Sequence, residues 1–219
     1  MRRIATLEDI AEGLEALCKA DARLLGVREA AGSIPLRLHP PGFASLAAVV
    51  VSQQVSTASA AAIHARFSAL FHPLTPQALL SADDEAFRQA GLSRPKQKAL
   101  IAIARAIEDG LNLESVVDLD GEAAMAALTS VSGIGPWTAE VYLLTAAGHP
   151  DVFPSKDVAL QAAVHHALNL ESRPGDKALA AMAESWSPWR AVAARLFWAY
   201  YRSIKGRDGL MTAPAPQQN

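Results

Sequence analysis

The sequence contains one cysteine, Cys18, among its 219 residues. A single cysteine forms no internal disulfide and cannot ligate an iron–sulfur cluster or build a cysteine zinc site. Long apolar runs are also missing, since the longest, 43–51, falls well short of the roughly 20 residues of a membrane-spanning helix. The N-terminus lacks the apolar core of a secretion signal. We therefore expect a cytoplasmic protein with no membrane partner and no iron–sulfur cluster.

A strong charge of either sign is missing as well, because the formal net charge is −2. This value argues mildly against a protein that binds polyanions over its whole surface. Basic residues gather in 88–105 and 190–207, and acidic residues in 8–15 and 108–122. Charge runs of this kind are usually solvated helix faces. The distribution permits a nucleic-acid partner without indicating one.

Aromatic residues are few, at 6% of the chain, yet all four tryptophans lie in its second half. Tryptophan is usually a core residue, and we expect this of Trp186 and Trp189. Trp137 falls on the first turn of a predicted helix, where the helix start should be exposed. It is therefore a candidate for the wall of a pocket.

Apolar residues recur with helical spacing along most of the chain, which predicts an all-α fold. Ser56, Ser93 and Ser187 stand where helix-capping residues are expected. The segment 24–41 is rich in Gly and Pro and predicts irregular structure, with room for a short strand at 35–38. The predicted helices are 6–20, 42–52, 56–71, 75–80, 83–90, 95–109, 121–128, 136–147, 157–168, 175–185 and 188–204, followed by a frayed tail from 210.

The segment 128–139, Leu-Thr-Ser-Val-Ser-Gly-Ile-Gly-Pro-Trp-Thr-Ala, predicts two helices joined by a tight turn. Gly133 and Gly135 allow the turn, and Pro136 is a good first residue for the second helix. The amides at such a helix start point outward at the positive end of a helix dipole, where a phosphate can bind. An ordinary corner between two helices would need the same glycines, so this segment alone leaves both interpretations open.

Two further candidates are polar residues at helix ends. Asp157 falls where the next helix begins, a position at which Asp commonly serves as an N-cap. The helix dipole would also stabilise its carboxylate, which could then act as a base or stabilise a cation. Gln53 and Gln54 stand at the corner between two helices, where they are either solvated turn residues or side chains that reach into a DNA groove.

Taken together, these segments resemble the helix-hairpin-helix DNA glycosylase superfamily, and within it the 3-methyladenine DNA glycosylase II branch. Four blocks in order carry the resemblance: 43–67 with its Ser-Gln-Gln-Val-Ser at 52–56, Gly-Leu-Ser-Arg-Pro-Lys-Gln-Lys-Ala-Leu at 91–100, the hairpin 128–139 followed by Val-Phe-Pro-Ser-Lys-Asp at 152–157, and 186–198. They cover 41–205. The third block is the most specific, because its Asp lies at the family's distance from the hairpin.

The resemblance implies a single domain over 1–209 with two helical lobes and a central cleft for a flipped nucleotide. One lobe would span about 44–150, and the other 1–43 together with 151–209, leaving 210–219 as a flexible tail. The implied partner is double-stranded DNA that contains alkylated bases, bound by a monomer associated with the nucleoid.

The family's functional residues carry over to particular positions here. Asp157 matches the catalytic aspartate, and Trp137 with Trp198 matches aromatic residues that line the base pocket. Gln54, with Gln53 beside it, falls where the family places the wedge that fills the gap in the duplex. The remaining matches are on the hairpin backbone, with amides for a DNA phosphate at Gly133, Gly135 and Thr138, and carbonyls for a monovalent cation, Na⁺ or K⁺, at Thr129, Val131 and Ile134.

One departure from the wider superfamily narrows the reaction. Relatives that also cut the DNA strand carry a lysine two residues after the second hairpin glycine, where this sequence has Trp137. The resemblance therefore implies a monofunctional glycosylase that leaves an abasic site, with no cofactor. Lys156 adjoins Asp157 and is expected to contact a phosphate at most.

Two alternatives remain open from the sequence. The chain could be a non-catalytic module that binds bent or damaged DNA, which would bind duplexes without releasing a base. It could also be a glycosylase for another lesion, such as uracil, hypoxanthine or ethenoadenine. A neutral base is a poorer leaving group and needs an acid near the pocket, and the sequence offers no candidate for that acid.

Overall fold

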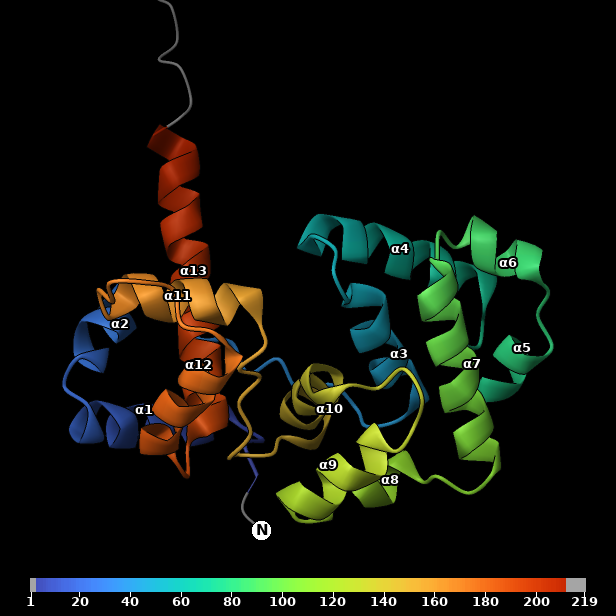
Figure 1. Cartoon of the computed structure of the whole chain (residues 1–219), viewed down its shortest axis with the longest axis horizontal. Coiled ribbons are helices and arrows are strands. Elements are labelled where there is room, and N and C mark those ends of the chain that lie inside the picture. The colour runs from blue at the N-terminus through green and yellow to red at the C-terminus, as the bar shows by residue number, and fades with distance from the viewer. Residues whose placement is uncertain (1–2, 212–219) are drawn as a thin grey trace, which may run out of the picture. The chain divides into compact units, whose positions relative to one another are not determined.

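A computed structural model describes residues 3–211 of the chain. In this part every regular element is a helix, which confirms the predicted all-α fold (Figure 1). The strand considered at 35–38 is absent from the described residues. No helix there has both the length and the apolar content that crossing a membrane requires.

The structure bears out most of the predicted helices and adds two short ones, α2 (Leu24–Ala31) and α8 (Leu113–Val116). The helix predicted from 136 divides into α10 (Pro136–Tyr142) and a π-helical turn, η1 (Leu143–Ala147). The others are α1 (Leu7–Ala20), α3 (Phe43–Ser52), α4 (Thr57–Leu70), α5 (Pro76–Leu80), α6 (Asp84–Gln89), α7 (Arg94–Glu108), α9 (Gly121–Thr129), α11 (Val158–Ala167), α12 (Asp176–Ala183), η2 (Glu184–Trp186) and α13 (Arg190–Met211).

Of the three serines predicted to cap helices, the structure confirms one as a side-chain cap and corrects the other two. Ser56 caps α4 by accepting the Ser59 N–H at 3.1 Å, as predicted. Ser93 stands at the N-cap of α7 but makes no side-chain capping bond. Ser187 does not begin a helix, because α13 starts only at Arg190. The helix α13 also runs through Leu210 and Met211, while 212–219 of the predicted tail lie outside the described residues.

The described chain forms two compact units, and one of them is discontinuous in sequence. The first unit takes residue 3 and 37–152, and the second takes 4–36 and 153–211. In Figure 1 the blue N-terminal helices α1 and α2 therefore lie with the orange and red helices of the C-terminal part.

The first unit is built around aromatic and aliphatic side chains beneath α3, α4 and α7. Phe71 packs on Phe67 and Phe87, with ring centroids 5.1 and 5.4 Å apart. The hydroxyl of the fully buried Tyr142 accepts the Gly42 N–H at 2.9 Å, which ties the start of α3 to the end of α10. Burial raises the pKa of Tyr142, so the phenol stays protonated in the core.

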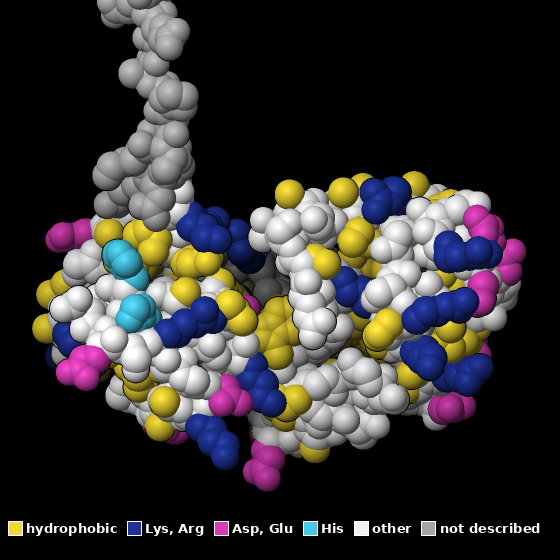
Figure 2. Space-filling model, turned by 45° about the horizontal axis from the view of Figure 1, so that its top comes forward, with side chains coloured by type: hydrophobic (Ala, Val, Ile, Leu, Met, Phe, Trp, Pro, Cys, Tyr) yellow, Lys and Arg dark blue, Asp and Glu magenta, His cyan; other side chains and the backbone are white. Residues whose placement is uncertain are grey.

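Basic residues of the first unit do not form a continuous patch around α6. Arg88 pairs with Glu85 at 2.6 Å, and Arg94 pairs with Asp84 at 2.8 Å. In the region of α5 to α7, Lys and Arg side chains alternate with Asp and Glu side chains (Figure 2). The first basic residues of the segment 88–105 are therefore solvated and paired with acidic residues. Each exposed pair contributes about 0–1 kcal/mol to the free energy of unfolding.

The second unit is built around α13, which packs on α2, α11 and α1. Trp186 is fully buried against Phe153 and Phe197, with ring centroids 5.4 and 5.1 Å apart. This confirms the core position predicted for Trp186, while Trp189 is only half-buried. The buried Arg195 of α13 donates from Nε to the Leu36 carbonyl at 3.0 Å and so fixes the end of the N-terminal segment.

Residue 13 of α1 must be small because α13 passes very close to it. A Cβ at Gly13 would lie 2.8 Å from side-chain atoms of both Trp189 and Val192. Gly26 of α2 offers a contrast, since a Cβ there would meet nothing within 4 Å.

We expect Gly13→Ala to lower the free energy of unfolding by about 1–3 kcal/mol, because overpacking outweighs the gain in helix propensity. Gly26→Ala is the matched control, and we expect it to raise the free energy of unfolding by about 0.5–1 kcal/mol. Urea denaturation measures both values. Equal stabilisation by the two substitutions would contradict the close packing of α1 on α13.

Candidate functional site

The hairpin between α9 and α10 turns by placing its apolar residues inward and its glycines outward. The Val131 N–H donates to the Leu128 carbonyl at 3.2 Å, and the Ile134 N–H donates to the Val131 carbonyl at 3.0 Å. The side chains of Val131 and Ile134 are buried, whereas Gly133 and Gly135 are exposed. The buried side chains of Val131 and Ile134 thus anchor the turn, while Gly133 and Gly135 remain accessible to solvent.

Gly133 is required by the fold itself. Its φ of +90° is rarely adopted by residues with a side chain, and a Cβ there would lie 2.4 Å from the Ala99 Cβ and 2.8 Å from the Ala99 Cα. The hairpin therefore rests directly on the backbone of α7. Gly135 differs, because its φ of −86° suits any residue and a Cβ would meet nothing within 4 Å.

The start of α10 is suited to binding an anion. Gly135 is its N-cap and supplies no capping side chain, and no acidic residue lies in the first turn. The first hydrogen bond typical of the helix runs from the Ala139 N–H to the Gly135 carbonyl at 3.1 Å. Amides before Ala139 lie at the positive end of the helix dipole, which attracts an anion. By contrast, the Asp120 side chain caps α9.

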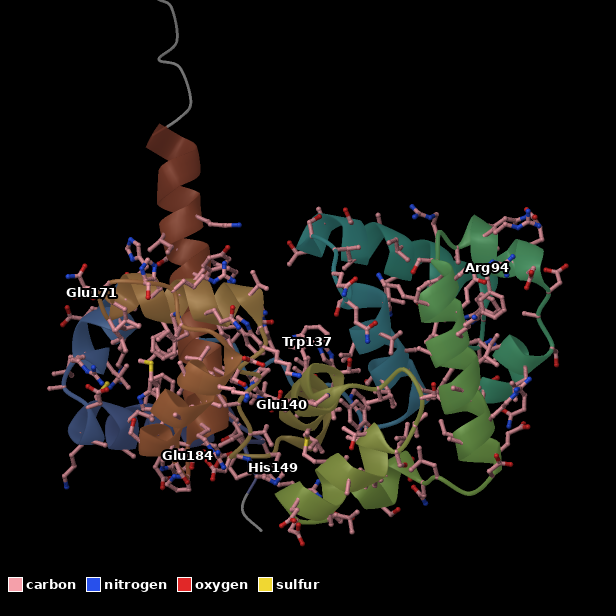
Figure 3. The ribbon with its side chains drawn as sticks, viewed as in Figure 1. Arg94, Trp137, Glu140, His149, Glu171 and Glu184 are labelled. Atoms are coloured by element: carbon pink, nitrogen blue, oxygen red, sulfur yellow. The ribbon has the colours of Figure 1, made fainter. Side chains whose placement is uncertain are left out.

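Trp137 and Thr138 occupy the first turn of α10 and face different surroundings. Trp137 is half-buried and lies beside the ribbon of α10 (Figure 3). Thr138 is buried, and its hydroxyl accepts a hydrogen bond from Nε2 of Gln53 at 2.8 Å. The structure thus brings Gln53 of the α3–α4 loop against the helix that follows the hairpin.

The two adjacent glutamines have different environments. The side chain of Gln53 is half-buried and bonded to Thr138, while Gln54 is exposed. The backbone of Gln54 has a φ of +54°, in the left-handed region that glycine would adopt more easily. The chain thus holds a long amide side chain at the exposed tip of this loop despite the conformational cost.

Asp157 is the N-cap of α11, which confirms the capping role predicted from the sequence. Its Oδ1 accepts the N–H groups of Ala159 at 2.9 Å and Leu160 at 3.0 Å. The indole Nε1–H of Trp198, on α13, donates to the same oxygen at 3.3 Å. Three donors on one oxygen fix the orientation of this half-buried carboxylate.

The residues predicted from the sequence thus come together in two groups, one within each unit. The hairpin, Trp137, Thr138 and the glutamine loop belong to the first unit. Asp157 and Trp198 belong to the second. Lys156 is exposed beside Asp157.

Sequence reasoning missed three polar residues that support these groups. Lys96 is buried, and its Nζ donates to the Val51 carbonyl at 2.7 Å. Gln161 donates from Nε2 to the Ser155 carbonyl at 3.0 Å, and Arg173 donates to the Val158 carbonyl at 2.9 Å, so both hold the segment around Asp157. A signal was present for Lys96, which lies four residues before Leu100 on the apolar face of its helix.

Metal-binding side chains do not gather anywhere in residues 3–211. No group of three or more His, Cys, Asp or Glu side chains there could hold a metal ion.

Comparison with known proteins identifies the family to which this arrangement belongs. The family model described as HhH-GPD superfamily base excision DNA repair protein matches residues 47–190, which include the hairpin and Asp157. The chain belongs to the HhH-GPD superfamily.

The matched relatives carry related names. DNA-3-methyladenine glycosylase 1 of Schizosaccharomyces pombe is 30% identical over 161 residues, which cover 71% of this chain and 71% of that protein. A solved structure of a 3-methyladenine DNA glycosylase from the same yeast, in complex with abasic DNA, matches with a TM-score of 0.80 and 27% identity, over 89% of this chain and 97% of that one.

A solved DNA-3-methyladenine glycosidase from Bacillus halodurans matches with a TM-score of 0.75 and 29% identity, over 92% of this chain and 96% of that one. Other curated relatives are longer proteins. The chain spans 45% of the length of one from Bacillus subtilis and 41% of one from Mycobacterium tuberculosis.

We expect Gly133→Ala to lower the free energy of unfolding by about 2–4 kcal/mol, since it combines a positive φ with a backbone clash. Gly135→Ala is the matched control and should change the same quantity by less than about 1 kcal/mol. Chemical denaturation of the two variants checks this. Similar stabilities would mean that the hairpin does not rest on α7.

Proposed function

We propose that this chain is a monofunctional DNA glycosylase that excises alkylated purines, of the 3-methyladenine and 7-methylguanine type, from duplex DNA in base excision repair. It would act as a monomer on chromosomal DNA inside the cell. The observation that carries the proposal is the carboxylate of Asp157, held by Ala159, Leu160 and Trp198 in a chain of the HhH-GPD superfamily. The names of the matched relatives support the alkylated-base class.

The chemistry needs one carboxylate. A base cannot be attacked within the duplex, so it is flipped out at a cost of a few kcal/mol. Cleavage of the glycosidic bond then develops positive charge on the sugar, which Asp157 stabilises while it orients or deprotonates a water molecule. A purine alkylated at N3 or N7 already carries positive charge and leaves without an acid. Tryptophan faces attract such a cationic ring, which supports base-pocket roles for Trp137 and Trp198.

The DNA backbone would be held by the hairpin. The amides of Gly133 and Gly135 precede α10 and that of Thr138 lies in its first turn, where there is no capping side chain and no acidic residue. The open space around Gly135 allows a phosphate to approach the backbone. Gln54, exposed at the tip of its loop, would fill the gap that the flipped nucleotide leaves.

A monovalent cation could strengthen this clamp through the carbonyls of Thr129, Val131 and Ile134. The Val131 carbonyl accepts one hydrogen bond, from Ile134, and a carbonyl oxygen has a second lone pair for a ligand. Such an ion would add positive charge next to the phosphate site.

We expect Asp157→Asn to reduce the rate of base release from methylated duplex at least about 100-fold, because charge stabilisation of the transition state is lost. Asn can still cap α11, so folding and binding to an abasic duplex should persist. Single-turnover excision of 3-methyladenine and 7-methylguanine measures the rate, circular dichroism measures folding, and titration with an abasic duplex measures binding. Full excision by the variant would refute the role of Asp157.

A panel of lesion-bearing duplexes in the same assay separates the alternatives. Release of uracil, hypoxanthine or ethenoadenine, without release of methylated purines, would assign a different lesion. Salt-sensitive duplex binding without any base release would indicate a non-catalytic module.

The product should be an intact strand with an abasic site. Trp137 stands where a strand-cutting relative would carry a lysine, and tryptophan cannot form a Schiff base with the sugar. We therefore expect cleavage products on a denaturing gel only after alkali treatment. Cleavage before alkali, or trapping of a covalent complex by borohydride, would contradict the monofunctional assignment. Lys156→Ala would then test Lys156 as the nucleophile.

A further inference from the structure

The loop that carries Gln54 is held at its base by three hydrogen bonds to consecutive carbonyls. Near the end of α3, the Ser52 hydroxyl donates to the Val49 carbonyl at 2.7 Å and the Gln53 N–H donates to the Val50 carbonyl at 3.2 Å. The Nζ of Lys96 donates to the next carbonyl, that of Val51, at 2.7 Å. Three consecutive carbonyls near a helix end, where intrahelical donors run out, are thus satisfied.

Lys96 makes this contact from the interior. It is buried and extends from the first turns of α7, so its ammonium is desolvated, which lowers its pKa. A buried ammonium is retained only where it has a good acceptor, and a carbonyl at the negative end of a helix is one. The interaction joins α7, on which the hairpin also rests through Gly133 and Ala99, to the end of α3.

Gln53 makes the second attachment. Its side chain donates to the hydroxyl of the buried Thr138, in the first turn of α10. Thr138 is three residues after Gly135, so the loop is bonded to the same helix start that would bind a phosphate. The exposed Gln54 therefore projects from a loop that is attached to α7 on one side and to α10 on the other.

We propose that Gln53 and Lys96 are positioning residues that hold Gln54 at a fixed offset from the phosphate-binding hairpin. Gln53, although adjacent to Gln54, then acts inward and is not itself part of the wedge. The proposal rests on the proposed function for the role of Gln54. The start of α10 would then determine both where a DNA phosphate binds and where Gln54 inserts into the duplex.

A double-mutant cycle between Gln53 and Gln54 tests the proposal. The rate of excision and the affinity for a duplex with a tetrahydrofuran abasic-site analogue are measured for Gln53→Ala, Gln54→Ala and the double variant. If Gln53 acts through Gln54, we expect Gln53→Ala to weaken both about 3–10-fold and the double variant to be little worse than Gln54→Ala alone. Equal costs of Gln54→Ala in both backgrounds would overturn the proposal.

Two further variants separate positioning from stability. Gln89→Ala removes an exposed glutamine on α6 of the same unit and should leave excision unchanged. Thr138→Val removes the acceptor of Gln53, so its effect should not add to that of Gln53→Ala. A purely structural role would instead lower the melting temperature in step with excision and give additive losses.

Hydrogen exchange gives a readout that does not depend on activity. In the protein without DNA, we expect Gln53→Ala and Lys96→Met each to speed amide exchange in the segment 51–53, whose amides are hydrogen-bonded at the end of α3, with exchange in α13 unchanged. Unchanged exchange in 51–53 would refute the attachment even in an active enzyme. Faster exchange in a protein that neither excises bases nor binds abasic DNA would support the attachment and refute the proposed function instead.

Discussion

The contact of Gly133 with Ala99 is the constraint on which the first unit's functional surface depends. The hairpin backbone lies so close to α7 that no side chain fits between them. This contact sets the position of the start of α10 relative to α7. The direction of α10 in turn sets the place of Trp137 and of Thr138, which bonds to Gln53. A shift of the hairpin by the width of one methyl group would therefore move the amides at the start of α10, the indole ring of Trp137 and the hydrogen bond to Gln53 together.

Asp157 caps α11 with the same carboxylate that the proposed chemistry would use. Its Oδ1 caps α11 and accepts the Trp198 indole N–H, so the interactions that orient the carboxylate are also those that begin the helix. Gln161 and Arg173 hold the backbone on either side of it. The cap predicted from the sequence is confirmed, and the proposed catalytic role would use the same carboxylate.

Local signals in the sequence were sufficient for most helices, for the hairpin and for Asp157 as a helix start. They failed where tertiary contacts decide. The helix α2 lies in a stretch whose Gly and Pro content predicted irregular structure, yet Leu24 and Val27 are buried and α13 packs on it. Ser187 resembles a cap, although α13 begins only at Arg190. Gln53 and Gln54 are identical in type and adjacent, and only the position of Thr138, 85 residues away, distinguishes their environments.

The discontinuity of the second unit has a consequence for the order in which the chain can fold during synthesis. The helices α1 and α2 leave the ribosome before the first unit, whereas α13, which packs on both, leaves after it. The first unit, apart from residue 3, is contained within 37–152 and can be completed while α1 and α2 still lack their partner. Until α13 is made, the surface around Gly13 and the side chain of Val27 remain exposed to solvent. The apolar faces of α1 and α2 therefore stay exposed during synthesis for longer than those of the helices within 37–152.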